Sequence, residues 1–167
     1  AEEIIDSGLD RLIISIDGLT QETYENYRVH GNLAKVIEAS KLLIEAKKAK
    51  ATATPHLIFQ FLAVKPNEHE IPAIFTLGNE MGIDEVRIKT AQVYNYENGN
   101  PLIPENEKYS RYKRQADGTY KLKYATGNHC WRMWSGSVLT WDGKVVPCCF
   151  DKDAQHVLGS IETSNFQ

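Results

Sequence analysis

The stretch Leu12-Ile13-Ile14-Ser15-Ile16-Asp17-Gly18 decides the fold of this chain. An apolar run broken only by Ser15 is typical of a strand buried on both faces, as strands of parallel sheets are. Asp17-Gly18 then ends the strand, because both residues favour turns over extended structure. The stretch therefore predicts an α/β protein with a parallel sheet and one polar hydroxyl within a buried strand.

Two more strands and two helices extend this pattern along the chain. The runs His56–Val64 and Asp84–Thr90 have the composition of buried strands, and Leu33–Lys48 has the apolar stripe of an amphipathic helix. A second helix is predicted between these later strands and ends at Gly82. The order strand–helix–strand–helix–strand predicts three parallel strands joined by right-handed crossovers, which we interpret as a partial parallel β/α barrel.

Local signals mark where the helices begin. Thr20 has the side chain of a helix N-cap. Asn67 and Glu70 have the spacing of a capping box for the helix after the second strand, and Pro72 lies early enough in that helix to be tolerated. These residues are therefore expected to close helix ends.

The pattern changes from helices to turns after Gln92. Arg111–Tyr124 alternates around Asp117-Gly118 and predicts a hairpin. Later, Trp141-Asp142-Gly143-Lys144 predicts a tight type I′ turn between short strands, because Asp-Gly suits two positive φ angles. We expect three parts in the chain: residues 1–93 from a partial barrel, 94–127 as a connecting loop and hairpin, and 128–167 as a small auxiliary domain rich in hairpins.

Composition excludes several classes of protein. The 167 residues are 42% hydrophobic and 25% charged, as in a globular domain. A net charge of -3 gives no electrostatic footprint for nucleic acid. No apolar run approaches the roughly 20 residues that span a bilayer. With no secretory signal in the sequence, we expect a cytoplasmic protein without a membrane or nucleic-acid partner.

All three cysteines of the chain, Cys130, Cys148 and Cys149, lie in one stretch together with all three tryptophans. Three interpretations stay open: buried free thiols, a disulfide, or a metal or iron–sulfur site with thiolate ligands. An odd cysteine count speaks against the disulfide. Two or three thiolates are few for a closed metal site, and the chain has no C-x-x-C motif.

Polar residues near the strand ends are the candidates for ligand binding, because ligands bind beyond the carboxyl ends of parallel strands. Ser15 and Gln60 interrupt apolar strands, and Asp17 follows the first strand. Each of the two interrupting side chains either bonds to neighbouring backbone or faces a ligand. Arg28 is either a solvated arginine or a clamp for a carboxylate.

At these residues the chain resembles a known family. Ile14-Ser15-Ile16-Asp17-Gly18-Leu19-Thr20, with Tyr24, Tyr27-Arg28 and Gly31, resembles the strand-and-loop signature of radical S-adenosylmethionine (SAM) enzymes with a SPASM or twitch-type auxiliary domain. Val64-x-Pro66-Asn67-Glu68 and Glu85-Val86-x-Ile88-Lys89 are similar to later strand ends of that family. Cys130-x12-Gly143-x4-Cys148 resembles the opening half of the auxiliary-cluster motif.

The resemblance implies a role for each matched residue. Ser15 would contact SAM, Arg28 would hold its carboxylate, and Asp17 would line the same site or shape its loop. Cys130 and Cys148 would ligate an auxiliary [4Fe–4S] cluster, with Cys149 as a further metal ligand or a spare buried thiol. Trp131, Trp134 and Trp141 would shield the cluster or simply pack in a core.

The C-x3-C-x2-C motif that holds the SAM-cleaving cluster in this family is absent from the chain. We therefore expect an internal fragment that does not encode that cluster and is inactive alone. The parent would be an oxidoreductase or maturase that cleaves SAM to a 5′-deoxyadenosyl radical, which abstracts hydrogen from a peptide or small-molecule substrate. The alternative is a non-catalytic, metal-linked protein-binding module. The apolar strand Leu12–Ile16 is also expected to expose an edge through which the fragment self-associates.

Overall fold

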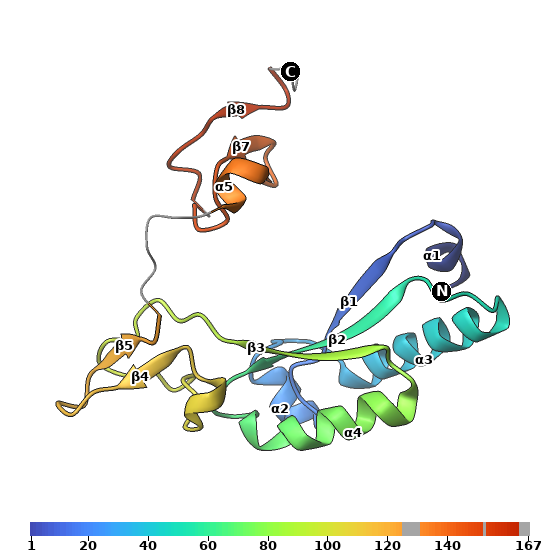
Figure 1. The fold of residues 1–167 in the computed structure, drawn as a ribbon, viewed down its shortest axis with the longest axis horizontal. Coiled ribbons are helices and arrows are strands. Elements are labelled where there is room, and N and C mark those ends of the chain that lie inside the picture. The colour runs from blue at the N-terminus through green and yellow to red at the C-terminus, as the bar shows by residue number, and fades with distance from the viewer. Residues whose placement is uncertain (125–130, 152, 164–167) are drawn as a thin grey trace. The chain divides into compact units, whose positions relative to one another are not determined.

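The structure is a computed structural model that describes residues 1–124, 131–151 and 153–163 of the chain (Figure 1). It contains two compact units, Ala1–Lys123 and Tyr124–Gln167. The fold is mixed α/β, with one parallel sheet and smaller antiparallel sheets. Each unit is built differently and is described by itself.

A three-stranded parallel sheet forms the centre of the first unit (Figure 1). Its strands are β1 (Arg11–Ser15), β2 (His56–Ala63) and β3 (Glu85–Thr90), in the order β1-β2-β3. The register places Ser15 opposite Gln60, and Gln60 opposite Arg87. The predicted strands and their parallel pairing are confirmed, whereas the partial barrel stays a prediction.

Helices connect these strands and cover the apolar side of the sheet. They are α1 (Glu2–Asp6), α2 (Gln21–Glu25), α3 (Leu33–Ala49), the 3₁₀ turn η1 (Glu68–Glu70) and α4 (Ile71–Met81). Ile16, Phe59, Phe61 and Ile74 are fully buried in the core between sheet and helices. Burial of such side chains contributes roughly 1.5–3 kcal/mol each, so this core holds the first unit together.

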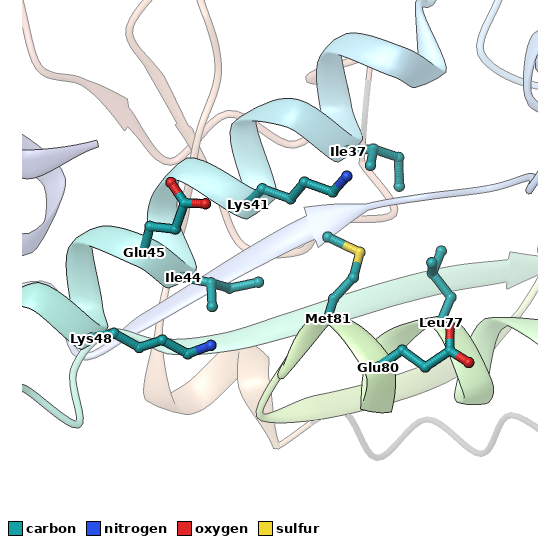
Figure 2. Close-up of a pocket in the computed structure, with 8 residues that line it drawn as sticks. All are labelled: Ile37, Lys41, Ile44, Glu45, Lys48, Leu77, Glu80 and Met81. Atoms are coloured by element: carbon teal, nitrogen blue, oxygen red, sulfur yellow. The ribbon is translucent and has the colours of Figure 1, made fainter.

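A groove of about 400 Å³ runs between α3 and α4 (Figure 2). Apolar side chains from both helices line it, together with charged ones. The apolar side chains are Ile37, Ile44, Leu77 and Met81, and the charged ones are Lys41, Lys48, Glu45 and Glu80. The groove therefore follows the contact between two amphipathic helices, whose charged residues border the apolar seam.

The predicted helix starts are partly confirmed. Thr20 caps α2 in a capping box with Thr23, and Gly82 ends α4 in the left-handed conformation with φ of 82°. The predicted capping box at Asn67 and Glu70 is wrong. Neither side chain caps η1 or α4, because both are bonded to other parts of the first unit.

Residues 91–123 complete the first unit. They contain η2 (Glu107–Tyr109) and the predicted hairpin, formed by β4 (Tyr112–Arg114) and β5 (Tyr120–Leu122). Tyr112 is buried, stacks on Tyr96 at 4.6 Å between ring centroids, and exchanges two hydrogen bonds with the backbone of Val93. This tyrosine fixes the hairpin to the chain that leaves β3.

The second unit is a small antiparallel sheet with one short helix, α5 (Arg132–Ser135). Its strands are β6 (Val138–Leu139), β7 (Lys144–Val146) and β8 (Gly159–Ser160), in the order β6-β7-β8. The predicted hairpin is confirmed, but its predicted type I′ turn is wrong. Gly143 has a positive φ of 75° and Asp142 does not, so a three-residue loop with one left-handed position replaces it.

Candidate functional site

The face of the parallel sheet opposite the helix-covered core carries polar side chains. Successive residues of a strand point to opposite faces. Ile14 and Phe59 pack in the helix-covered core, so their neighbours Ser15 and Gln60 project to the other face, in one row with Arg87. Neither Ser15 nor Gln60 forms a side-chain hydrogen bond within the described part of the chain. At the last residue of β1 the sheet therefore presents a hydroxyl that is available to a ligand.

Asp17 organises the loop after β1. Its side chain is 1% exposed, and both carboxylate oxygens accept hydrogen bonds. Oδ1 accepts the backbone N–H of Leu62 at 2.8 Å, and Oδ2 accepts Nε–H of Arg28 at 2.6 Å. Because both oxygens are engaged inside the protein, the geometry favours the loop-shaping role over direct contact with a ligand.

Arg28 is held by one nitrogen only. Its Nε pairs with Asp17, its guanidinium lies 5.5 Å from the centre of the Tyr27 ring, and 41% of its side chain is exposed. Among the described residues, nothing accepts a hydrogen bond from its two terminal nitrogens. An arginine fork fixed at Nε with free terminal nitrogens suits a carboxylate.

The turn after β2 is hydrogen-bonded to the loop that follows β1. Asn67 is fully buried; it donates to the carbonyls of Asp17 and Leu62 and accepts the N–H of Val64. Glu70 accepts hydrogen bonds from Leu19 and Thr23. The spacing of these two polar residues predicts helix capping and misses this role. For Asn67 the signal was its position shortly after the end of β2; for Glu70 the sequence holds no such signal.

Only glycine fits at position 18, because this part of the loop lies very close to the backbone of α2. A Cβ atom at this position would lie 2.3 Å from the backbone nitrogen of Tyr24, at the start of the chain segment that leads to Arg28. No side chain fits at that distance. The Asp-Gly pair therefore allows α2 to pack directly on the loop, which places Arg28 near Asp17.

In the second unit, Cys148 directly follows β7 and Pro147. Cys148 is partly buried, Cys149 is exposed, and both are free thiols. They line a cavity of about 250 Å³ with Met133, Val138 and neighbouring backbone. The Cys148 sulfur accepts the N–H of Phe150 at 3.4 Å, a bond of the kind that stabilises cluster-ligating thiolates.

Cys130 lies outside the described residues. Within the described ranges, no group of three His, Cys, Asp or Glu side chains is placed to hold a metal ion. The two described thiols nevertheless fit a cluster chemically, because they are soft sulfur donors beside a shared cavity.

Asp151 shapes the loop between these cysteines and β8. Its oxygens accept the backbone N–H groups of Gln155 and His156 at 2.8 Å each, and its own N–H bonds the carbonyl of Cys148. Burial raises the pKa of this carboxyl, but the amides of His156 and Gln155 outweigh burial, and the pKa lies below the usual value. The ionised carboxylate therefore fixes the chain that follows Cys148.

The tryptophans neither pack in a core nor enclose the described cysteines. Trp131 and Trp134 are each 78% exposed, and Trp141 is 98% exposed. Core packing, one of the two interpretations made from the sequence, is thus wrong for these side chains, whereas shielding of the cluster stays a prediction. The reason is the shape of the unit: Trp141 lies in the turn before β7, where its side chain meets no packing partner.

Comparisons with known proteins bear on both sites. A model of the SPASM family, described as an iron-sulfur cluster-binding domain, matches residues 130–167. A curated relative, the probable GTP 3′,8-cyclase of Methanocaldococcus jannaschii, is 27% identical over 176 aligned residues, which cover 92% of this chain and 55% of that protein. The chain thus spans about half the length of this relative. No solved structure gives a significant match.

None of the helices in the described ranges is both long and apolar enough to span a bilayer. The family match begins at Cys130 and includes both described cysteines, while the match to the cyclase extends over the parallel sheet as well. These matches support [4Fe–4S] clusters and SAM as the cofactors. Residues 130–167 therefore match a SPASM iron–sulfur domain, and the two matches together support a radical SAM enzyme with such a domain.

Proposed function

We propose that this chain supplies part of the SAM site and part of the auxiliary cluster site of a radical SAM oxidoreductase or maturase. One observation carries the proposal. Arg28, which follows α2, is held at Nε by Asp17 in the loop after β1, the strand that ends in the unbonded hydroxyl of Ser15.

In this proposal the residues of the first unit bind and orient SAM. The terminal nitrogens of Arg28 bind the SAM carboxylate, the Ser15 hydroxyl donates a hydrogen bond to the same ligand, and Asp17 keeps the guanidinium in place. Orientation matters because misplacing a reacting group by about 1 Å costs about 10²-fold in rate. When bound and reduced by one electron, SAM would supply a 5′-deoxyadenosyl radical, the species proposed to abstract hydrogen from a substrate.

The second unit would hold an auxiliary [4Fe–4S] cluster through Cys148 and Cys130, with Cys149 as the further candidate ligand. The Phe150 amide would stabilise the Cys148 thiolate, and Asp151 would fix the following loop. The substrate class we propose is a peptide or a small molecule. The activity on GTP in the name of the relative is not part of this proposal.

The test uses the full-length protein with its clusters reconstituted under anaerobic conditions. We expect 5′-deoxyadenosine, detected by mass spectrometry, after addition of SAM and a reductant. Arg28→Ala and Ser15→Ala should lower its formation, whereas Arg114→Ala, at an exposed position of β4, should not. A protein loaded with iron clusters that forms no 5′-deoxyadenosine would overturn the proposal.

A second candidate function is a non-catalytic, metal-linked binding module. The observation that favours it is the exposure of Trp131, Trp134, Trp141 and Phe150 in the second unit, because aromatic residues are enriched in protein interfaces. Metal analysis separates the two candidates. Zinc that remains bound in air supports the module, whereas oxygen-sensitive iron and sulfide support the enzyme.

Self-association of residues 1–167 is proposed through β1. This strand is at one edge of the three-stranded sheet, and Ile13 on it is 49% exposed. Exposed apolar edges pair with other chains. Light scattering of residues 1–167 should give a mass above the monomer, and Ile13→Lys should restore the monomer. A monomeric mass at high concentration would exclude the proposal.

A further inference from the structure

We propose that Glu70 is a positioning residue for Arg28 and thereby for the carboxylate of SAM. The inference rests on the proposed function, because it assumes that Arg28 binds that carboxylate. Glu70 belongs to the turn after β2 and lies 42 positions from Arg28 in the sequence. It acts through hydrogen bonds to the loop that carries the arginine.

The first step is the contact between Glu70 and that loop. Glu70 is 7% exposed, so its two oxygens are hydrogen-bonded inside the protein and not to bulk water. Oε2 accepts the backbone N–H of Leu19 at 2.8 Å, and Oε1 accepts the hydroxyl of Thr23 at 2.8 Å. One carboxylate therefore fixes the residue that precedes the N-cap of α2 and a residue inside that helix.

The second step connects α2 to Arg28. The backbone N–H of Arg28 bonds the carbonyl of Tyr24 at 2.8 Å, and the Tyr24 side chain is buried. Gly18 packs against the backbone of Tyr24. The loop, α2 and the start of Arg28 therefore form one connected body, and whatever fixes α2 also fixes the arginine.

Three side chains hold this body to β2 and the turn that follows it, and one of them is Asn67, which donates to the Asp17 carbonyl. At one end Asp17 accepts the Leu62 amide and the Arg28 guanidinium. At the other end Glu70 holds Leu19 and Thr23. Loss of Glu70 leaves the Asp17 anchor in place, so the unit still folds. The guanidinium then gains freedom, and binding of a carboxylate must restrict it again.

The same turn offers a matched control. Glu68 also accepts two hydrogen bonds, from the backbone N–H groups of Glu105 and Asn106 at 2.9 Å each. Replacing Glu68 removes as many bonds from the same 3₁₀ turn as replacing Glu70. Its partners, however, lie in the segment after β3 and not in the loop of Arg28.

The experiment compares SAM with decarboxylated SAM as ligands of the reconstituted full-length protein, by equilibrium dialysis. The expected loss of SAM affinity is about tenfold or more for Arg28→Ala and about fivefold for Glu70→Ala. Decarboxylated SAM should bind these two variants nearly as well as it binds the parent. Glu68→Ala should change the affinities for both ligands equally or not at all.

Glu70→Gln provides the rescue. The amide oxygen of glutamine can accept the Leu19 N–H, and its amide nitrogen can donate to the Thr23 hydroxyl, so most of the SAM affinity should return. Amide hydrogen exchange gives a second measurement without SAM. Residues 19–28 should exchange faster in Glu70→Ala than in Glu68→Ala.

The outcomes distinguish the two proposals. If Arg28→Ala leaves SAM affinity unchanged, the proposed function of Arg28 fails. If Arg28→Ala is selective for SAM but Glu70→Ala weakens both ligands equally, or neither, the positioning role alone is overturned. Selective loss in both variants, with rescue by Glu70→Gln, supports the inference.

Discussion

The two units of this chain are held together by different physical means. The first unit buries large apolar side chains between a sheet and its helices, among them Phe59, Phe61 and Ile74. In the described part of the second unit, Val146 is the one buried hydrophobic residue, while three tryptophans and Phe150 are exposed. Packing thus specifies the first unit, whereas the second has little apolar burial to oppose its conformational entropy.

A small domain with so little core needs another source of stability. Thiolate ligation is such a source, because a metal site absent from the unfolded chain adds its binding free energy to folding. The cavity beside Cys148 and Cys149 is in this poorly packed unit, and the SPASM match covers it. We therefore predict that the stability of the second unit depends on its cluster and that the stability of the first unit does not.

Removal of the metal is the largest expected effect. In the full-length protein, chelation of iron should abolish amide protection in residues 138–146 and leave residues 57–63 protected, as measured by hydrogen-exchange mass spectrometry. Cys148→Ser should have the same local effect. Unchanged protection of residues 138–146 after complete loss of iron would show that the second unit folds without its metal.

The second-largest effect is expected from truncating a core side chain of the first unit. Phe59→Ala should lower the free energy of unfolding of the first unit by about 3–5 kcal/mol, since the side chain is fully buried. Trp141→Ala, at a side chain 98% exposed, should change the stability of the second unit by less than about 0.5 kcal/mol. Urea unfolding followed by circular dichroism measures the first change. A large cost for Trp141→Ala would mean that the tryptophan is covered in solution.

A smaller effect is expected from the buried carboxylate of the first unit. Asp17→Asn replaces one acceptor oxygen by a donor, which then faces Leu62 N–H or Arg28 Nε–H, at a cost of about 2 kcal/mol. Asp10→Asn, at an exposed position before β1, is the control and should be neutral. Equal stabilities of the two variants in urea would contradict the role assigned to Asp17.

The smallest expected effect is a loss of stability at acidic pH, and it is expected in both units. In the first unit, burial opposes ionisation of Asp84, but hydrogen bonds from Lys47 and the Leu57 amide lower its pKa below the ordinary value of 3.8. In the second unit the pKa of Asp151 is also lowered, because the amides of His156 and Gln155 outweigh burial.

A pKa that is lower in the folded state means that the unfolded state binds the proton more readily. The stability from Asp84 and Asp151 is therefore complete above pH 3.8 and is lost as pH falls through the folded pKa values. Asp84→Asn should flatten this acid loss in the first unit, and Asp151→Asn in the second. Amide exchange of each unit between about pH 2 and 5 measures the two losses separately, and identical profiles for variant and parent would refute them.

The sequence was sufficient for the elements of the first unit, since their signals are local. The apolar runs gave the strands, the stripe from Leu33 gave α3, and Thr20 and Gly82 marked helix ends as the structure has them. The hairpins were also predictable from Asp-Gly pairs. The turn type was not predictable. An Asp-Gly pair occurs both in turns where only the glycine has a positive φ and in type I′ turns where both residues do.

Partners distant in sequence were not predictable. Asn67 and Glu70 have the spacing of a capping box, but their side chains bond Asp17, Leu19 and Thr23, which lie 47 to 51 positions away, in addition to local partners of Asn67. Ser15 and Arg28 are candidates by their positions near the strand ends, and only their roles toward SAM come from the family resemblance. The structure adds the link between the loop and Arg28, which is the carboxylate of Asp17. The exposure of the tryptophans depends on tertiary packing, which their composition does not determine.

The short turn η1 constrains how the length of this chain can vary. Glu68 and Glu70 are two positions apart on a 3₁₀ turn, where each residue advances the side chain by about 120°, so they point to different segments. A single inserted or deleted residue between them would rotate one carboxylate away from its amides while leaving the composition intact. Related sequences are therefore expected to vary freely in the loop between α3 and β2 but to keep a fixed spacing of acidic residues here.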